Sequence, residues 1–376
     1  MSKHLKRRKP LKLPLLILLD VAMIGAALVI FALFHHVIPY RQQSTGIVSE
    51  RPGGAYTDQP ETEEEMIFDL SGAELNEASE AAQIPAEREA TIEPTIEPTP
   101  EPTPQPTEIV PDATPAPTAT PDPVGYFGRK FSGKFCEAGG AQNGNNYQGV
   151  NANVTVIRKK IGRSYVCVED IYIRDISNLI TVFAKDQYGH GYTEWAGNMA
   201  ARRSGIATIT GDYYGTHSDG IVIRNGTVYR ATNSGGADVC VLYWDGVMET
   251  YKAQEFNVQA AVKRGAYQAW CFGPELLDEN GKAYRSFDSE IARSNPRAAI
   301  GYYEPGHYCF VLVEGRTVHS TGMTLTELSA TMEALGCKSA YNLDGGATAM
   351  MFAGTQRVNE IGDNSRPCSD AIMIVN

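Results

Sequence analysis

Apolar and polar residues alternate along much of the chain after residue 150, and this period of two predicts β-strands. The clearest runs are "NANVTVIRKKI", "YVCVEDIYIRD", "GIATITGDYY", "AAIGYY" and "YCFVLVEGRTVH". Two more runs contain the pairs Asn225-Gly226 and Asp245-Gly246, which favour tight hairpins between neighbouring strands. The pattern therefore predicts a strand-rich domain that contains several hairpins.

One segment, "TLTELSATMEALG", has the three-to-four-residue apolar spacing of a helix. Thr324 and Glu327 have the spacing of a capping box at its start, and Gly336 suits a left-handed position at its end. Strands are predicted after it, in "CKSAYNLDGG" and "DAIMIVN". Strand, helix and strand in this order favour a crossover with some parallel pairing. The expected class is α+β, a strand-rich mixed sheet with covering helices.

The N-terminal part has a different pattern. Six Lys/Arg occur in the first twelve residues, and the next 22, residues 13–34, are apolar except for Asp20. A helix of that length, at about 1.5 Å per residue, covers a hydrocarbon core of roughly 30 Å. Because a basic flank stays cytoplasmic, we expect a cytoplasmic tail at 1–12, a transmembrane signal anchor at 13–38 and an extracellular C-terminal part. A cleaved signal peptide is the alternative.

Residues 39–123 hold 18 Asp/Glu against three Arg, and from Thr91 they become a Pro-Thr-Glu repeat, "TIEPTIEPTPEPTPQPTE". Such a composition does not bury enough apolar surface to offset its chain entropy. Its prolines favour extended polyproline II. We therefore expect a disordered acidic Pro/Thr-rich linker that acts as a passive spacer and holds the following domain away from the membrane.

Residues 124–376 remain as a folded part of 253 residues, enough for one large domain or two small ones. Its 24 Lys/Arg and 25 Asp/Glu nearly balance, which argues against a broad surface for nucleic acid. All seven cysteines lie here, without a CxxC pair, so a zinc ribbon or thioredoxin-type site is not expected. One or two disulfides stay open, with no pairing assigned.

The stretch "YNLDGGATAMM" places an acid and two glycines at the end of a predicted buried strand. Ligands bind at such strand ends in open α/β sheets. Asp344 supplies a carboxylate, Asn342 an amide and Thr348 a hydroxyl, while Gly345 and Gly346 allow backbone N–H groups to form an anion nest. Together they suit a sugar or a phosphate. A tight turn with an Asx-type bond is the alternative.

Arg297, in "SNPRAAIG", directly precedes an apolar strand. Its guanidinium offers a planar fork of donors that matches phosphate oxygens. We expect Arg297 and Asp344 to face one hollow at neighbouring strand ends. A salt bridge that caps the strand is the alternative role for this arginine.

Other candidates lie in loops beside predicted strands. Asp212 and His217 share a glycine-punctuated loop, and Arg366 and Asp370 precede the final strand. His217 is a candidate acid/base or a ligand, although a solvated loop histidine is the commoner case. Ser320 lies just before the capped helix, whose N-terminus favours anions. For each of these residues, capping or an ordinary loop role is the alternative.

The motifs "NPRAAIG", "GRTVHSTGMTLTELSATMEALGCKSAYNLDGGATAMM" and "RPCSDAI" occur in an order that resembles the phosphodiester glycosidases, from about Gly205 to Asn376. That family hydrolyses the bond between an anomeric carbon and a phosphodiester oxygen. The resemblance implies that Arg297 holds the phosphate and that Asp344 lies in the active centre, shaped by Gly345, Gly346 and Thr348.

The chain departs from the family pattern at two positions. The family commonly has a third glycine and then Ser-Ser after the acid, where this chain has Ala347, Thr348 and Ala349. Ala347 requires a position that avoids a positive φ, and Ala349 lacks a hydroxyl. Activity and substrate choice are therefore less directly implied than the fold.

We expect an anchored extracellular hydrolase of sugar-1-phosphodiesters, of the GlcNAc-1-phosphate type, in envelope glycans. Glycosyl transfer usually needs two carboxyl groups, so Asp344 as base, nucleophile or metal ligand is paired with Asp212 or Asp370. A divalent cation, Ca²⁺ or Mg²⁺, is a further expectation. The alternatives are a non-catalytic glycan-binding or assembly module, and a different hydrolase such as a peptidoglycan-directed one.

Overall fold

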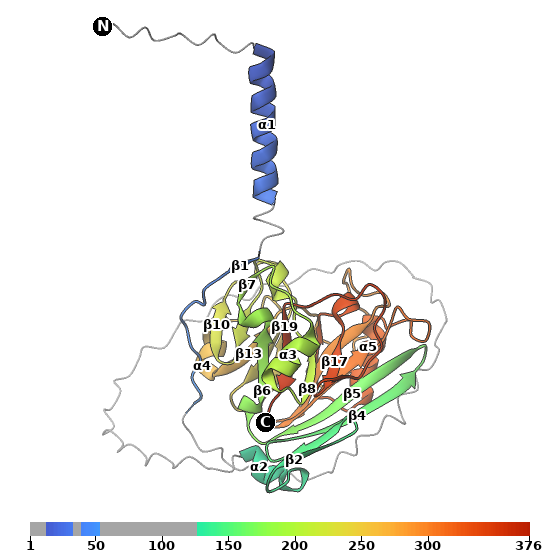
Figure 1. The fold of residues 1–376 in the computed structure, drawn as a ribbon. Coiled ribbons are helices and arrows are strands. Elements are labelled where there is room, and N and C mark those ends of the chain that lie inside the picture. The colour runs from blue at the N-terminus through green and yellow to red at the C-terminus, as the bar shows by residue number, and fades with distance from the viewer. Residues whose placement is uncertain (1–12, 33–38, 53–125) are drawn as a thin grey trace, which may run out of the picture. The chain divides into compact units, whose positions relative to one another are not determined.

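The computed structural model describes residues 13–32, 39–52 and 126–376 of the chain (Figure 1). The predicted basic tail and residues 53–123 of the predicted linker lie outside the described residues. Most of the described strands belong to three sheets, and every pairing between these strands is antiparallel. The prediction of a strand-rich α+β protein is therefore confirmed.

The largest sheet has seven strands. In spatial order they are β16 (Ser339–Leu343), β14 (Arg297–Glu304), β15 (His307–Val313), β5 (Ser164–Ile173), β4 (Ala152–Ile161), β3 (Asn146–Gly149) and β2 (Gly140–Asn143).

Two five-stranded sheets lie beside it. One contains β18 (Gln356–Arg357), β17 (Met351–Ala353), β8 (Ala207–Thr210), β19 (Asp370–Ile374) and β6 (Leu179–Phe183). The other contains β10 (Thr227–Arg230), β9 (Val222–Arg224), β13 (Ala266–Trp270), β11 (Val239–Tyr243) and β12 (Met248–Tyr251). Both predicted hairpins are present as β9–β10 and β11–β12, and Asn225 and Gly226 both have the positive φ that their turn requires.

The helices are few. They are α1 (Leu13–Ala32), α2 (Tyr126–Lys130), α3 (Ala196–Arg203), α4 (Val258–Arg264) and α5 (Leu325–Ala334). The sequence patterns predicted α1 and α5 but neither α3 nor α4. In α5 the capping box between Thr324 and Glu327 is formed, and Gly336 has a φ of +79°. Among the described residues, no helix combines the length and the apolarity that crossing a membrane requires.

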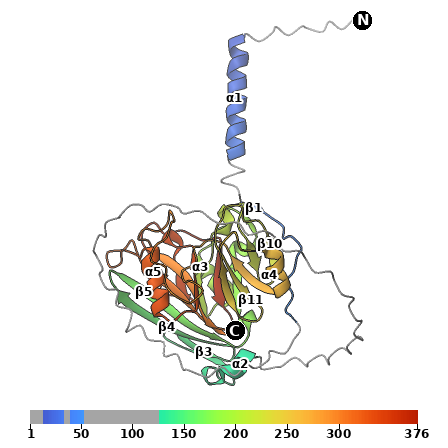
Figure 2. The same cartoon turned by 180° about the vertical axis from the view of Figure 1, so that it is seen from behind.

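The chain passes from β15 through α5 to β16, and both strands pair with β14, which lies between them. Since each is antiparallel to β14, they run parallel to one another without touching. The predicted crossover is thus confirmed, whereas the expected direct parallel pairing does not occur among the described strands. In Figure 2, α5 lies with β4 and β5 on one side of the domain, and α4 lies with β10 and β11 on the other.

The main hydrophobic core is shared by all three sheets. It contains Phe310 from the seven-stranded sheet, Ile209 and Ile372 from the sheet around β8, and Leu242 and Trp270 from the sheet around β11. A second cluster fills the space under α5, and a third lies under α4. Because the three sheets pack on one core, the strand ends that leave it are held in fixed positions.

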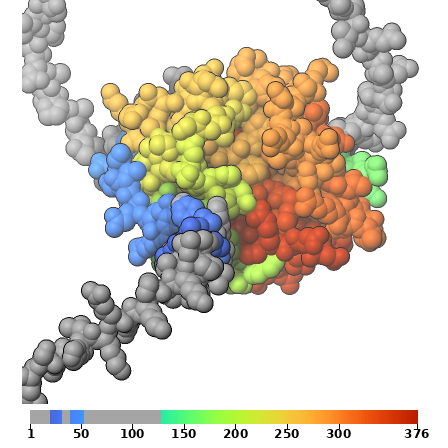
Figure 3. Space-filling view, turned by 90° about the horizontal axis from the view of Figure 1, so that it is seen from above, coloured from blue at the N-terminus to red at the C-terminus, as the bar shows by residue number. Residues whose placement is uncertain are grey.

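Residues 39–52 pack on the domain rather than behaving as linker. Here β1 (Tyr40–Arg41) pairs antiparallel with β7 (Gly189–His190), and Tyr40 stacks on His190 with ring centroids 5.4 Å apart. Figure 3 shows these light-blue residues against the yellow-green residues of the sheet around β10. The predicted linker boundary at residue 39 is therefore wrong. The composition of residues 39–52 suggested disorder, but backbone hydrogen bonds pair this polar segment with the domain.

Candidate active site

Three strand ends meet at one place in the fold. The backbone N–H of Asp344, just after β16, donates to the carbonyl of Gly211, just after β8, at 2.9 Å. The N–H of Gly211 in turn donates to the carbonyl of Asp370, the first residue of β19, at 3.0 Å. A Cβ on Gly211 would lie 2.1 Å from Oδ1 of Asp370, so only glycine fits against this carboxylate. These bonds place Asp212, Asp344 and Asp370 at adjoining strand ends.

A buried arginine binds two of these acids. Arg224, the last residue of β9, forms ion pairs with Oδ1 of Asp212 at 2.8 Å and with Oδ2 of Asp370 at 2.9 Å. Its Nη1 also donates to the carbonyl of Ala269. Oδ2 of Asp212 accepts from the N–H of Cys271 at 2.9 Å. The Asp212–Arg224–Asp370 triad is thus a buried network whose carboxylates are tied by charge and by backbone donors.

Asp344 differs from these two acids. Its side chain is 4% exposed, and its Oδ2 is buried and accepts no hydrogen bond from any described residue. Burial raises the pKa of Asp344 to about 7, and the charges of Asp370 and Asp212 add to the rise, whereas Thr348 and Arg366 oppose it. A carboxyl with this pKa exchanges its proton near neutral pH, as a general acid or base must.

A basic and aromatic group forms the surface beside Asp344. Arg366 is exposed, and its guanidinium carbon lies 4.8 Å from the ring centroid of Tyr213. The Tyr213 ring makes an edge contact with His217 at 5.3 Å. Tyr213 has a φ of +66°, a left-handed conformation that is uncommon for a bulky residue and that occurs preferentially at functional sites. Arg366 supplies a positive charge that acts on Asp344 and is open to solvent.

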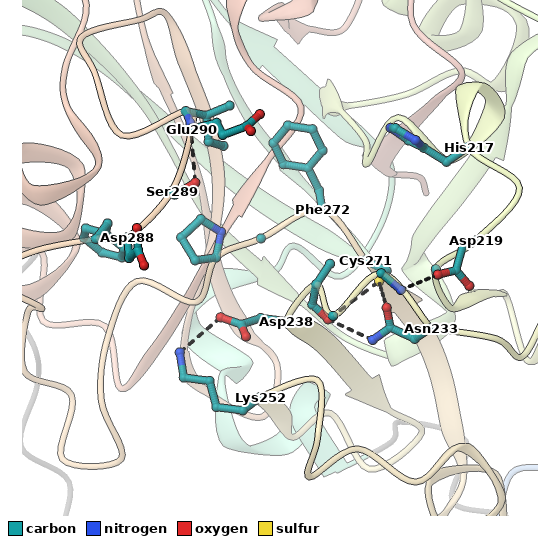
Figure 4. Close-up of a pocket in the computed structure, with 18 of the residues that line it drawn as sticks. His217, Asp219, Asn233, Asp238, Lys252, Cys271, Phe272, Asp288, Ser289 and Glu290 are labelled. Carbon is teal, nitrogen blue, oxygen red and sulfur yellow. Dashed lines mark hydrogen bonds and ion pairs between the residues drawn. The ribbon is translucent and has the colours of Figure 1, made fainter.

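A cavity of about 770 Å³ adjoins this group through His217 (Figure 4). Its lining includes Asp219, Phe272, Tyr284, Phe287 and Glu290, and in Figure 4 the Phe272 ring lies between the labelled side chains of His217 and Glu290. The cavity wall is connected to the acid cluster, because the backbone N–H of the lining residue Cys271 donates to the carboxylate of Asp212. A hollow of this size accommodates a sugar ring with a substituent.

The turn after β16 shows why two glycines follow the acid. A Cβ on Gly345 would lie 2.6 Å from the carbonyl oxygen of Pro296, so the turn packs on the backbone that enters β14. Gly346 has a φ of +61°. Thr348 is buried, and its hydroxyl donates to the carbonyl of Gly345 at 2.8 Å.

The two departures from the family pattern lie in tolerant positions. Ala347 has no positive φ, the condition that an alanine there must meet, and its carbonyl accepts from the N–H of Arg366 at 2.9 Å. Ala349 is buried in the main core. A hydroxyl at residue 349 would therefore face packed side chains, and its absence removes nothing from the open surface near Asp344.

Arg297 lies next to the turn after Asp344 in the backbone, but its side chain binds the loop before α5. Its Nε donates to the carbonyl of Met323 at 2.9 Å, and its Nη2 donates to the carbonyls of Ile291 at 2.7 Å and Arg293. Burial lowers the pKa of Arg297 to about 10. These contacts hold the loop that contains Ile291, a residue of the cavity wall. Neither Arg297 nor Asp344 lines this cavity, so the expected common hollow of the two residues is not observed there. Direct phosphate binding by Arg297 stays a prediction.

Two other predicted residues have structural partners. The Nδ2 of Asn342 donates to the carbonyl of Gly273, a cavity-lining residue, at 2.7 Å, while its Oδ1 is buried and accepts no hydrogen bond from the described residues. The hydroxyl of Ser320 accepts from the N–H of Tyr165 at 3.0 Å, at the start of β5. Asn342 therefore belongs to the cavity wall, and Ser320 to a separate loop contact.

Few side chains near Asp344 are available as ligands for a cation. Among residues 13–32, 39–52 and 126–376, no group of three or more His, Cys, Asp or Glu side chains is arranged to hold a metal ion. Divalent cations prefer several free carboxylate or carbonyl oxygens, but Asp212 and Asp370 are committed to Arg224. These residues do not fit a Ca²⁺ or Mg²⁺ site as they stand.

The family match agrees with this geometry. Residues 203–375, just under half of the chain, match the model of the phosphodiester glycosidase family. The matched range includes all the acids described above, Arg224, Arg366 and all the residues that line the cavity. The family is one of glycosidase-type hydrolases, and the resemblance noted in the sequence motifs is confirmed.

Individual relatives are distant. A stretch of 173 residues is 27% identical to the SPbeta prophage-derived uncharacterized protein YomE of Bacillus subtilis (strain 168) and covers 44% of this chain, but only about a quarter (27%) of that protein. The catalytic domain of zebrafish N-acetylglucosamine-1-phosphodiester alpha-N-acetylglucosaminidase has a TM-score of 0.48 at 17% identity, covering 60% of this chain and 83% of that one. A hypothetical protein from Synechocystis has a TM-score of 0.46 at 13% identity, covering 60% and 62%. At TM-scores below 0.5, the two structures support no statement about activity.

Sequence reasoning missed Arg224 and Tyr213. Arg224 lies in "GIVIRNG", where an arginine next to a hairpin turn has the pattern of an exposed strand residue. The signal that was available is the apolar run Ile221–Ile223 directly before it, which favours burial of the strand. Tyr213 has a left-handed φ, which a tyrosine in the sequence does not signal.

Proposed function

We propose that this domain hydrolyses glycosyl phosphodiesters, with Asp344 as the group that moves the proton. The observation that carries the proposal is the buried carboxyl of Asp344, whose Oδ2 has no partner among the described residues, beside the exposed Arg366. The family match over residues 203–375 supports the reaction class.

In this reaction the oxygen of water bonds to the anomeric carbon, and the bond from that carbon to the phosphate oxygen breaks. The departing phosphate keeps the electron pair, and a positive charge next to it stabilises the transition state. We assign that role to Arg366, whose guanidinium lies over the Tyr213 ring. Asp344 moves the proton that the exchange of water for phosphate requires, and the cavity beside His217 takes the sugar or its aglycone.

The substrate we propose is a sugar-1-phosphodiester of the GlcNAc-1-phosphate type in envelope glycans. An extracellular location with residues 13–38 as the anchor is proposed from the sequence alone, on the basis of the apolar run and its basic flank. Protease treatment of intact cells that carry a C-terminal tag tests the location, because an outward-facing domain loses its tag.

A second candidate is a glycan-binding module without turnover. It is favoured by one observation: two of the three clustered carboxylates are committed to Arg224, whereas glycosidases usually use two carboxyl groups with separate roles.

One experiment separates the two candidates. Protein that begins at residue 39, and so keeps the packed segment 39–52, is incubated with a panel of GlcNAc-1-phosphodiesters and UDP-GlcNAc, and free GlcNAc is measured. Hydrolysis that falls about 10²–10⁴-fold in Asp344→Asn supports the enzyme with Asp344 moving the proton. Binding without release of sugar supports the module. Release that persists at full rate in Asp344→Asn removes that residue from the chemistry.

A further inference from the structure

Residues 39–52, the docking segment, extend the sheet around β10 at its edge. The N–H of Thr45 donates to the carbonyl of Val228 at 3.0 Å, and the N–H of Val228 donates back to the carbonyl of Ile47 at 3.0 Å. Further along, the N–H of Ser49 donates to the carbonyl of Gly226 at 2.7 Å. This is strand addition, in which main-chain hydrogen bonds supply the affinity.

Side chains at the end of the docking segment add specific contacts. Arg51 makes a two-pronged contact with Asp175, at 2.8 Å and 3.3 Å. The indole Nε1 of Trp244 donates to the carbonyl of Ser49 at 2.9 Å. Ser49 is 1% exposed, and its hydroxyl donates to the carbonyl of Val262. The end of the docking segment is therefore partly buried in the domain and held by side-chain contacts as well as by main-chain hydrogen bonds.

The domain has glycines where the docking segment lies closest. A Cβ on Gly189 would lie 2.1 Å from the carbonyl oxygen of Tyr40, and a Cβ on Gly265 would lie 3.1 Å from the ring of Pro52. Gly265 has a positive φ, which by itself accounts for a glycine at this position. Gly189 has no positive φ, and the close approach of the docking segment is the feature that requires glycine there.

The docking segment and the start of α2 lie on the same domain, since Phe127 is buried in the main core. Residues 53–125 are the covalent connection between the two. We propose that residues 39–52 are a docking strand that keeps residues 1–52 attached to the domain of the same chain, non-covalently, after the chain is cut within residues 53–125. The attachment of the domain to whatever holds the N-terminus would then survive proteolysis of the Pro/Thr/Glu stretch.

The test uses the full chain in detergent, with an N-terminal affinity tag and the recognition sequence of a specific protease inserted within residues 91–123. After complete cleavage, the tag is captured and the fragment that contains residues 126–376 is followed through repeated washes. We expect most of this fragment to stay on the resin. Its loss in the first wash would overturn the proposal.

Matched variants show which contacts hold the fragment. Gly189→Leu should speed release at least about tenfold, because its side chain collides with the backbone at Tyr40. Arg51→Asp and Asp175→Arg should each speed release by about two- to fivefold, as expected for an exposed ion pair, and the double exchange should restore retention. Retention that none of these variants changes would place the attachment elsewhere.

A mixing control tests whether docking is within one chain. Two copies with different tags are co-expressed, and one tag is captured before cleavage. Recovery of the second copy through the docking segment would show exchange between chains and would overturn the intrachain assignment. Melting curves of each variant before cleavage exclude loss of the fold as the cause of release.

Discussion

The Asp212–Arg224–Asp370 triad and Asp344 are joined through the backbone of Gly211, and burial raises the pKa of both Asp344 and Asp370 to about 7, yet their partners differ. The triad is fully buried, and both of its carboxylates contact the same guanidinium. Asp344 is nearly as buried, but its Oδ2 has no partner among the described residues. Burial alone therefore does not separate these acids; what distinguishes them is whether both carboxylate oxygens have partners among the described residues.

A satisfied carboxylate contributes to folding, and its removal leaves a buried charge behind. An unsatisfied one is costly to bury and is retained where it has chemistry to perform. From this contrast, we expect the triad to control stability and Asp344 to control turnover, and the following measurements test that separation.

The largest effect is expected at Arg224. Arg224→Met removes the charge shared by Asp212 and Asp370, so the free energy of unfolding should fall by about 3–5 kcal/mol. Urea unfolding at neutral pH measures it, with Asp344→Asn as the matched control, which should lose no stability and is expected to gain some. Equal losses in both variants would remove the contrast between the two regions.

The pH dependence of stability sharpens the contrast. The pKa of Asp344 is raised by burial to about 7 in the folded state, against about 3.9 in an unfolded chain. Between these two pKa values the folded state holds a proton that the unfolded state has lost. The stability that Asp344 gains from this proton is fully present below about pH 4, declines as the pH rises towards 7, and is absent well above pH 7. Between pH 5 and pH 8 the native chain should lose about 2–3 kcal/mol more unfolding free energy than Asp344→Asn. Parallel curves for the two proteins would contradict it.

Two arginines offer a test of smaller effect. Arg366 is exposed beside Asp344, so Arg366→Gln should lower kcat/KM by about 10–100-fold, the loss of one charge-assisted contact to phosphate, with little change in unfolding. Arg297 braces backbone carbonyls, so Arg297→Gln should lower stability instead. Steady-state kinetics on the folded fraction and urea unfolding of both variants decide it, and the opposite assignment would restore Arg297 as the phosphate ligand.

The smallest effect is expected at Ala347. Ala347→Gly restores the glycine of the family pattern, but residue 347 has no positive φ to relieve. The unfolding free energy should fall by about 0.4–1 kcal/mol through greater freedom of the unfolded chain, and kcat/KM should stay within about twofold. A large rise in activity would mean that the alanine hinders the turn after β16.

Local patterns predicted the local parts of this structure. The capping box at Thr324 and Glu327 and the turn at Asn225-Gly226 depend on residues close in sequence, and both are present. The position of Asp344 at the end of a buried strand followed from the apolar run before it. These features need no knowledge of what packs against them.

The features that sequence reasoning missed depend on distant partners. Arg224 is buried because Asp370, 146 residues away, reaches it. Arg297 faces the loop before α5 instead of the acid, because backbone carbonyls there take up its donors. The docking segment is held largely by main-chain bonds, and these leave no trace in the pattern of side chains.

The site is assembled from the ends of strands that belong to three different sheets: β16, the pair β8 and β19, and β9 with β13. Each sheet brings its own connecting loops to the rim. Under the proposed function, changes in one set of loops would alter which sugar or aglycone is admitted, while the Asp344 carboxyl, delivered by another sheet, keeps its place. Because the loops come from different sheets, substrate selectivity can change one loop at a time while the carboxyl keeps its position.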